Sequence, residues 1–201
     1  PMSCHPLMVY DKRFQKSDRK LLDEGEPFTF TPERRAELDD LLTKYPPEQK
    51  RSAVLAALYL LQDQQGHLTA SGMRHVAGIL GLTPAEVEDV ATYYVMFYKE
   101  PVGKFVLQVC RTLSCALMGA ERVTEALSEK LGLKVGETDK SGMFTLLEFE
   151  CLGACDRAPI VMVNNEHWHE KVKPEDVGRL VDDIKAKGQA ALTGCHLHVE
   201  R

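Results

Sequence analysis

The 201-residue sequence has no apolar run long enough to cross a bilayer, no long basic run and no internal repeat. Its longest apolar stretch, Ala53 to Leu61, falls well short of the roughly 20 residues that a transmembrane helix needs. A net charge of −5 without a basic cluster argues against nucleic acid as the main partner. With 44% hydrophobic and 27% charged residues, the composition is that of a soluble globular protein without direct membrane insertion.

The first eleven residues lack both a secretory apolar core and an Arg/Ser-rich presequence. Six cysteines would allow three disulfides in a secreted protein. Without a secretory signal we expect a reducing compartment, where thiols serve metals or redox chemistry. The prediction is therefore a cytosolic protein.

Four of the six cysteines form two close pairs. Four residues separate Cys110 from Cys115, and three separate Cys151 from Cys155. Neither pair has the C-x-x-C spacing of a thioredoxin-type motif or of most zinc knuckles, and no third cysteine follows Cys115 as in plant-type ferredoxins. Four thiolates are what a [2Fe–2S] cluster needs, two for each iron. The spacing favours such a cluster, with structural zinc, a redox disulfide and chance burial of the cysteines as the alternatives.

The remaining cysteines and the histidines lie outside the two close pairs. We interpret Cys4 as a free thiol in an N-terminal arm of residues 1–27, and residues 189–201 as a C-terminal tail. The tail contains Cys195-His196-Leu197-His198, a spacing that could bind a metal. We interpret His67 and His75 as packing or surface residues. His167 and His169 are interpreted as exposed residues of one short strand.

Residues 28–100 contain four helical patterns. Thr31-Pro32-Glu33 and Thr83-Pro84-Ala85-Glu86 both combine an N-cap residue, a proline at the first helical position and an acid in the first turn. In the second signal Glu86 is placed to close a capping box. Apolar residues recur at helical spacing after each start, and Gly66 and Gly81 end the second and third helices. We predict a small four-helix bundle.

Residues 101–188 have a different pattern. Strands are predicted at 105–109, 144–150, 160–163 and 167–171, with helices at 116–131 and 174–188 and a hairpin turn at Asn164-Asn165. This order predicts a thioredoxin-like sheet with helices packed against it, so the fold class is α+β. The aromatic run Tyr93, Tyr94, Phe97 and Tyr98 at the end of the bundle is predicted to form core and domain contacts.

Each cysteine pair begins immediately after a predicted strand, where rigid strand ends support exposed loops. Gly153 and Ala154 let backbone amides approach the sulfurs, and Thr112 and Ser114 are further hydrogen-bond donors. Pro159 fixes the chain direction after the second loop. Two cations lie in or near the loops and would raise the reduction potential if they faced a cluster, namely Arg111 and Arg157. Because neither loop offers a nucleophile–base pair, one-electron transfer is the predicted chemistry.

These motifs together resemble those of a known family, the thioredoxin-like [2Fe–2S] subunit of respiratory complex I, NADH:quinone oxidoreductase. The resemblance covers roughly Phe28 to Lys187. The matching motifs are Lys44-Tyr-Pro-Pro47, Val90-Ala-Thr-Tyr-Tyr94, Gly103-Lys104, Cys110-x-Thr112-x-x-Cys115, Glu150-Cys-Leu-Gly-Ala-Cys155 and Ala158-Pro159 with Val163-Asn164.

The resemblance implies that Cys110, Cys115, Cys151 and Cys155 ligate one [2Fe–2S] cluster. It also implies a partner flavoprotein subunit that binds FMN and NADH and holds a [4Fe–4S] cluster. The chain would then lie on the cytoplasmic side of the bacterial plasma membrane, or on the mitochondrial matrix side, as a peripheral part of the complex. We expect residues 28–100 to be the docking surface for the flavoprotein.

Two alternatives stay open. The same fold and cysteine pattern serve NAD-linked hydrogenases and formate dehydrogenases, in which the chain would be the corresponding diaphorase subunit. From a different class, a structural zinc module could recruit partners through its helices without redox chemistry. A red-brown protein with acid-labile sulfide would favour the cluster, and a colourless protein containing zinc would favour the module.

Overall fold

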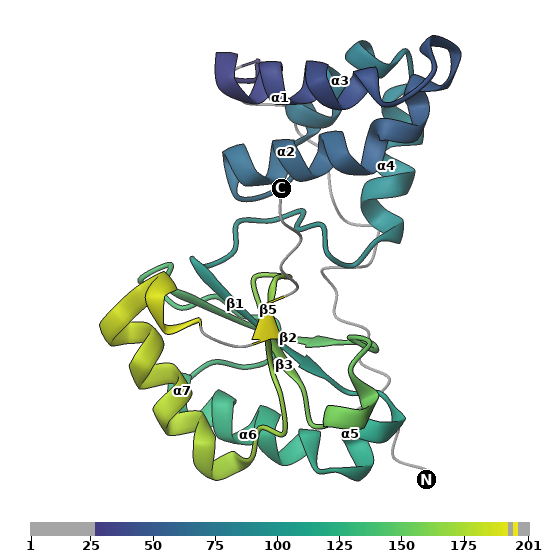
Figure 1. Cartoon of the computed structure of the whole chain (residues 1–201). Helices are drawn as coiled ribbons and strands as arrows, with labels where there is room; N and C mark the ends of the chain where they lie inside the picture. Colours follow the sequence, from purple (N-terminus) through teal and green to yellow (C-terminus); the bar gives the residue numbers. More distant parts are fainter. Residues whose placement is uncertain (1–26, 193–194, 197–201) are drawn as a thin grey trace, which may run out of the picture. The chain divides into compact units, whose positions relative to one another are not determined.

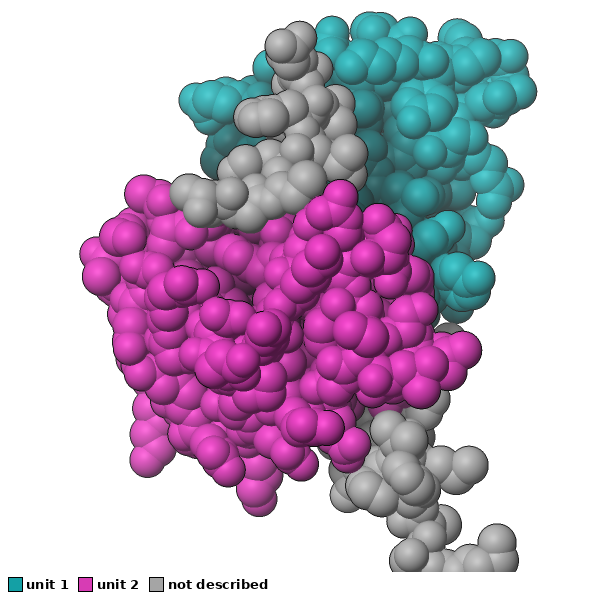
Figure 2. All heavy atoms as spheres, turned by 60° about the horizontal axis from the view of Figure 1, so that its bottom comes forward, with its two compact units in different colours: residues 1–101 teal, residues 102–201 magenta. Residues whose placement is uncertain are grey.

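The structure is a computed structural model, and it describes residues 27–192 and 195–196. The chain divides into two compact units, residues 1–101 and residues 102–201 (Figure 2). The division falls at Pro101, where the sequence changes from helical to strand patterns. Each unit has its own hydrophobic core. No helix among the described residues combines the length and apolarity needed to cross a membrane.

The first unit is helical (Figure 1). Four α-helices form where the sequence predicts them, and a 3-10 helix that the sequence did not predict follows Pro46. Their bounds are α1 (Pro32–Thr43), η3 (Pro47–Ala53), α2 (Val54–Gln65), α3 (Ala70–Leu80) and α4 (Pro84–Tyr93). They share one core, which includes Leu38, Leu58, Leu61, Val76, Val87 and Phe97.

The predicted cap residues begin and end these helices. The Thr31 hydroxyl accepts a hydrogen bond from the Arg34 amide at the start of α1. At the start of α4, the Glu86 carboxylate accepts from the Thr83 amide at 2.9 Å while the Thr83 hydroxyl accepts from the Glu86 amide, which completes the capping box. Gly66 has a positive φ of 81° and ends α2, a conformation that glycine adopts without steric cost.

The aromatic run after α4 divides between core and surface. Phe97 is buried in the core of the first unit, whereas the Tyr93 side chain is 78% exposed. Gln62 of α2 fixes the segment, because its side chain donates to the Met96 carbonyl at 3.0 Å and accepts from the Tyr98 amide at 2.7 Å. The prediction of a core contact is therefore confirmed for Phe97, and Tyr93 lies on the surface.

The second unit is built on a five-stranded mixed sheet with the order β2-β1-β3-β4-β5. β1 and β2 are parallel, and the other pairs are antiparallel. The strands are β1 (Phe105–Cys110), β2 (Phe144–Phe149), β3 (Val161–Val163), β4 (His167–His169) and β5 (Cys195–His196). α6 (Ala120–Leu131) and α7 (Pro174–Lys187) lie together on one side of this sheet (Figure 1). This is the mixed helix and sheet class that the sequence predicts.

Two boundaries differ from the prediction. The helix expected at 116–131 is divided into α5 (Leu113–Leu117) and α6, because Gly119 between them has a left-handed φ of 89°. The segment assigned to a tail begins with η5 (Gly188–Ala191), Leu192 is buried in the core, and β5 pairs with β4. Residues 189–192 and 195–196 therefore belong to the second unit.

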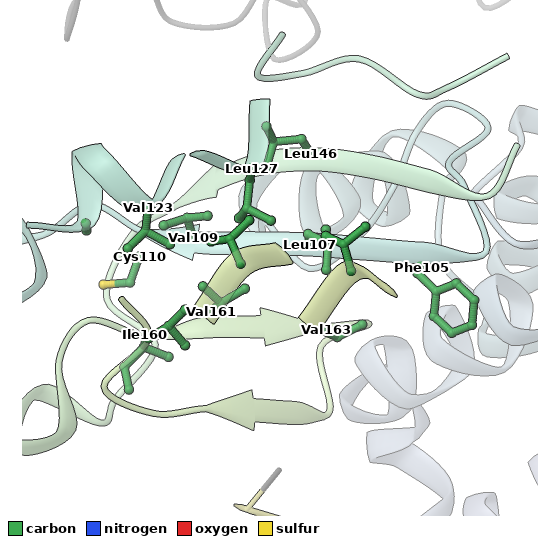
Figure 3. Packing of buried hydrophobic residues seen from close by; sticks show 14 of the residues in the cluster. Phe105, Leu107, Val109, Cys110, Val123, Leu127, Leu146, Ile160, Val161 and Val163 are labelled. Carbon is green, nitrogen blue, oxygen red and sulfur yellow. The ribbon is translucent and has the colours of Figure 1, made fainter. Parts of the chain in front are cut away.

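The core of the second unit ends at the first cysteine. Phe105, Leu107 and Val109 form a row of buried side chains along β1, packed against residues of β2, β3 and α6 (Figure 3). Cys110 is the last residue of that strand and is also buried. Apolar burial of this kind stabilises the fold by about 25 cal/mol per Å² of apolar area removed from water. The rigid core thus supports the first cysteine directly.

The predicted turn at Asn164-Asn165 is confirmed. Both asparagines have positive φ, 56° and 60°, and they are the central residues of a turn that the hydrogen bond from the Glu166 amide to the Val163 carbonyl closes. Their side chains also bind β1, since Asn164 Oδ1 accepts from the Val106 amide at 2.7 Å and Asn165 Oδ1 accepts from the Gln108 side chain at 2.6 Å. These bonds satisfy the fully buried Gln108 and fix β3 and β4 against β1.

Candidate functional site

The sheet topology brings the two cysteine pairs together. β1 and β2 are parallel neighbours, and Cys110 at the end of β1 lies opposite Phe149 at the end of β2. The carboxyl ends of parallel strands meet at one edge of a sheet, so the loops that follow them start side by side. The first loop leads to Cys115 in α5, and the second carries Cys151 and leads to Cys155, the first residue of η4 (Cys155–Arg157). All four predicted residues thus belong to adjoining loops.

The two pairs differ in exposure. Cys110 and Cys115 are 2% and 1% exposed, whereas Cys151 and Cys155 are exposed. The sulfurs of Cys151 and Cys155 lie 3.4 Å apart, and the thiols of Cys110 and Cys115 also interact directly. Each pair is therefore already assembled, one in the core and one at the surface.

Hydrogen-bond donors from both loops reach the sulfurs. The Thr112 hydroxyl lies 3.2 Å from the Cys110 sulfur, and the Gly153 amide donates to the Cys151 sulfur at 3.4 Å. Gly153 has a φ of 82°, which favours glycine at this position. The prediction of a backbone donor is confirmed for Gly153, and the Thr112 hydroxyl lies within hydrogen-bond distance of the Cys110 sulfur as predicted. Ser114 contacts Cys155, while the Ala154 carbonyl accepts a bond from the Arg157 amide.

The buried pair holds one thiol of low pKa and one of high pKa. Burial raises the pKa of the Cys115 thiol to about 11, and its hydrogen bond to Cys110 acts in the same direction. Burial acts on Cys110 as well, but bonds from Thr112, from the Cys115 thiol and from the Leu152 amide together lower its pKa. Cys110 is therefore the thiol of the buried pair that ionises more readily.

The exposed pair shows the same asymmetry. The Gly153 amide and then the Cys155 thiol lower the pKa of Cys151. The pKa of Cys155 is raised, first by the hydrogen bond between Cys155 and Cys151 and then by the negative charge of Cys151. Thiolates are the metal-binding form, and each pair combines one cysteine that ionises more readily with one that ionises less readily.

The two arginines near the loops are both held by carboxylates. Arg111 forms ion pairs with Glu148 at 3.8 Å and Glu150 at 3.0 Å. Arg157 contacts Asp156 and Glu170, each at 3.2 Å. The positive charge of each side chain is therefore largely offset. Either arginine would raise the reduction potential of a cluster if its charge faced the sulfurs. These contacts direct both side chains at carboxylates instead.

The histidines contact residues outside the cysteine loops. His75 packs edge-on against Phe28 and Phe30, which agrees with the predicted packing role. The expectation that His167 and His169 are exposed is wrong, because both are partly buried and the His167 side chain is only 12% exposed. The His167 Nε2 lies 3.4 Å from the side-chain nitrogen of Gln189 in η5. Cys4 and His198 fall outside the described residues.

The donor arrangement fits a binuclear cluster. A [2Fe–2S] cluster takes two thiolates on each iron, and the site supplies two assembled pairs. The amide and hydroxyl donors around the sulfurs are also what a negatively charged cluster needs.

Comparison with known proteins places the chain in a family. Residues 38–185 match the thioredoxin-like [2Fe–2S] ferredoxin family, and the chain belongs to it.

Three similar proteins support this assignment, and each is named as a subunit of NADH-quinone oxidoreductase. The chain is 40% identical over 159 residues to the relative from Rickettsia bellii, covering 79% of this chain and 95% of that protein. It is 38% identical over 174 residues to the relative from Mycobacterium tuberculosis, strain H37Rv, covering 85% of this chain and 68% of that protein. The relative from Thermus thermophilus is 38% identical over 149 residues, which cover 74% of this chain and 82% of that protein.

Among solved structures, an NAD⁺-reducing [NiFe]-hydrogenase in its H2-reduced state has a similar fold. The TM-score is 0.58 at 18% identity, over 67% of this chain and 22% of that chain. This chain thus spans about a fifth of the hydrogenase chain, and the likeness concerns the fold alone.

Sequence reasoning missed three contributors to the site. The Leu152 amide donates to Cys110 and the Ile160 amide donates to Cys115. Neither leucine nor isoleucine indicates an amide–sulfur contact by its residue type, so no motif could have revealed these two donors. The third is Trp168 in β4, whose indole Nε1 donates to the Leu152 carbonyl at 3.0 Å. Its only signal was that it is the sole tryptophan of the chain.

Proposed function

We propose that this chain is the electron-transfer subunit of the NADH dehydrogenase module of respiratory complex I. One [2Fe–2S] cluster would be held by Cys110, Cys115, Cys151 and Cys155. The observation that carries the proposal is the pair of adjoining cysteine loops at the ends of two parallel strands. Membership of the [2Fe–2S] family and the three similar subunits of NADH-quinone oxidoreductase support it.

The cluster, when bound, supplies reversible uptake of one electron. The chain's own residues offset the negative charge that this uptake increases. The amides of Leu152, Gly153 and Ile160 and the Thr112 hydroxyl are directed at sulfurs. These donors are fixed by the strands and loops before any electron arrives, so little reorganisation accompanies reduction.

The two pairs would have different tasks. Cys110 and Cys115 lie within the hydrophobic core and would anchor one iron in a position that solvent does not reach. Cys151 and Cys155 are exposed and would hold the other iron where a partner protein can approach. Electron exchange with the partner would therefore take place on the side of the second loop.

In this proposal the electron donor is a flavoprotein subunit that binds NADH and FMN. Exposed apolar side chains occur in both units. Where such side chains lie next to one another on a subunit, they are typical of a surface covered by a partner. In the helical unit, the predicted docking module, they include Tyr59, Tyr93, Tyr94 and Val95. Tyrosine is enriched at protein interfaces, and the T-shaped Tyr93–Tyr94 pair is a suitable anchor.

A second exposed apolar group adjoins the cysteines. Leu113 and Leu117 of α5 and the following Met118 are all exposed. They flank Cys115, so a partner that covers them would also exclude water from the site. The chain would then be a peripheral component on the cytoplasmic face of the bacterial membrane, or on the matrix side in mitochondria, attached through its partners.

The likeness to an NAD⁺-reducing hydrogenase favours one further candidate. The chain could be the corresponding diaphorase subunit of an NAD-linked hydrogenase or a related formate dehydrogenase. The fold serves both roles, but the relatives at 38–40% identity are named as subunits of NADH-quinone oxidoreductase. We therefore place complex I first.

Isolation of the native protein with its partners tests the choice. We expect membrane-associated material that contains the flavoprotein and quinone-module subunits. The chain separated from it should hold about two irons in a binuclear cluster and give an electron paramagnetic resonance signal after reduction. A soluble assembly with a nickel or molybdenum subunit would assign the chain to the second candidate. A colourless zinc protein would contradict both.

A further inference from the structure

Trp168 connects the sheet to the second cysteine loop. It lies in β4 opposite Met162 of β3, and its ring packs against the core of the second unit. The indole Nε1–H donates a hydrogen bond to the carbonyl oxygen of Leu152 at 3.0 Å. Leu152 lies between Cys151 and Gly153, so this bond joins a rigid strand to the exposed loop.

The acceptor belongs to the same peptide group as a sulfur donor. The Leu152 carbonyl and the Gly153 N–H form one planar trans peptide, in which C=O and N–H point in opposite directions. The carbonyl accepts from Trp168, and the Gly153 N–H donates to the Cys151 sulfur at 3.4 Å. A relay of two hydrogen bonds therefore runs from the indole through one peptide to Cys151.

Such a relay acts on the sulfur in two ways. Fixing the carbonyl fixes the plane of the peptide, which holds the N–H on Cys151 in a loop without regular secondary structure. A carbonyl that accepts a hydrogen bond also polarises its peptide and strengthens the bond that the N–H donates. Both effects favour negative charge on the Cys151 sulfur.

We propose that Trp168 is a positioning residue that holds the Gly153 amide on the Cys151 sulfur and thereby raises the reduction potential of the cluster. The inference rests on the proposed ligation of a [2Fe–2S] cluster by this sulfur. Reduction adds one electron and increases the negative charge on the sulfurs, and no bond forms or breaks. Donors to sulfur stabilise the reduced state more than the oxidised one, so loss of the relay lowers the potential.

The sequence allows the N–H to be removed without removing the ring. Because Trp168 is the only tryptophan, replacing tryptophan throughout the protein with β-(3-benzothienyl)alanine changes this position alone and exchanges N–H for sulfur. Trp168→Phe is the genetic counterpart, which also loses part of the ring. The matched packing control is Met162→Leu, since Met162 is the buried cross-strand neighbour of Trp168.

The measurement is a mediated redox titration of the cluster-loaded full chain, followed by electron paramagnetic resonance. We expect the midpoint potential to move to more negative values in both the analogue protein and Trp168→Phe. Met162→Leu and a 5-fluorotryptophan protein, which keeps the N–H, should not show that shift. The Fe–S(Cys) stretching bands in resonance Raman spectra should change together with the potential.

The outcomes distinguish a failure of the proposed role of Trp168 from a failure of the proposed function. An analogue protein with an intact cluster and the wild-type potential overturns the role of Trp168 and leaves the proposed function in place. An equal negative shift in Met162→Leu assigns the effect to packing and also overturns it. A wild-type chain that binds no iron and sulfide overturns both the relay and the proposed function.

Discussion

The sulfur atoms of Cys151 and Cys155 lie 3.4 Å apart in an exposed loop, while the other half of the site, Cys110 and Cys115, is buried in the core. A disulfide requires about 2.05 Å between sulfurs, so this is a contact between two thiols and not a bond. The two pairs therefore differ in how far solvent reaches their sulfurs.

Loss of any one of the four paired cysteines should remove the cluster. We expect alanine at Cys110, Cys115, Cys151 or Cys155 to reduce bound iron and acid-labile sulfide well below the level of about two per chain. Cys4→Ala and Cys195→Ala are matched controls, because these cysteines lie outside the two loops. Iron and sulfide analysis with the visible spectrum measures the result. Retention of a normal cluster in Cys110→Ala would contradict the assignment.

The cluster-free reduced protein should lose stability at alkaline pH. Burial raises the pKa of Cys115 to about 11, from an ordinary value of 9.0. A thiol with a raised folded-state pKa contributes stability that is present below the unfolded pKa and is lost as pH rises through the folded value. Between about pH 9 and 11, thermal unfolding should report a loss on the order of 2 kcal/mol.

The partner thiol acts in a different pH range. The pKa of Cys110 is lowered, so its contribution is present above the unfolded value and is lost as pH falls through the folded value. Cys115→Ala is the control, because it should flatten the alkaline part of the profile. If that variant loses as much stability at alkaline pH as the unsubstituted protein, the buried thiol is not the cause.

Gly103→Ala should destabilise the second unit. A Cβ at Gly103 would lie 2.7 Å from the backbone carbon of Phe144, where neither segment can yield without moving a strand. We expect a cost of about 1–3 kcal/mol, typical of overpacking. The matched control is Gly178→Ala in α7, where a Cβ meets nothing within 4 Å. That change should stabilise the helix by about 0.5–1 kcal/mol. Chemical denaturation measures both, and equal effects would refute the steric explanation.

Removing an exposed aromatic side chain from the helical unit should weaken docking without affecting the cluster. Tyr93 is 78% exposed and stacks edge-on with Tyr94, so its removal leaves the core of the unit intact. We expect Tyr93→Ala to weaken binding to the flavoprotein by about tenfold or more, as at interface hot spots. Lys50→Ala, an exposed change in η3, is the control. Unchanged affinity for the flavoprotein would show that the docking surface lies elsewhere on the chain.

The sequence by itself determined the helix starts at Thr31 and Thr83, the Asn164-Asn165 turn and the identity of the four paired cysteines. These features depend on local preferences, namely capping side chains, residues that tolerate positive φ and ligand spacing. It did not predict the break at Gly119 or the pairing of β5, because both depend on what the rest of the chain packs against.

Only the tertiary structure decided how the site is divided and supported. Parallel pairing of β1 with β2 places two loops, distant in sequence, at one edge, and the core buries one cysteine pair while the other stays exposed. The donors from Leu152 and Ile160 are backbone groups, and the bond from Trp168 joins β4 to the loop that follows β2. Such contacts cannot be inferred from residue types, because they depend on the distances and directions between groups in the folded chain.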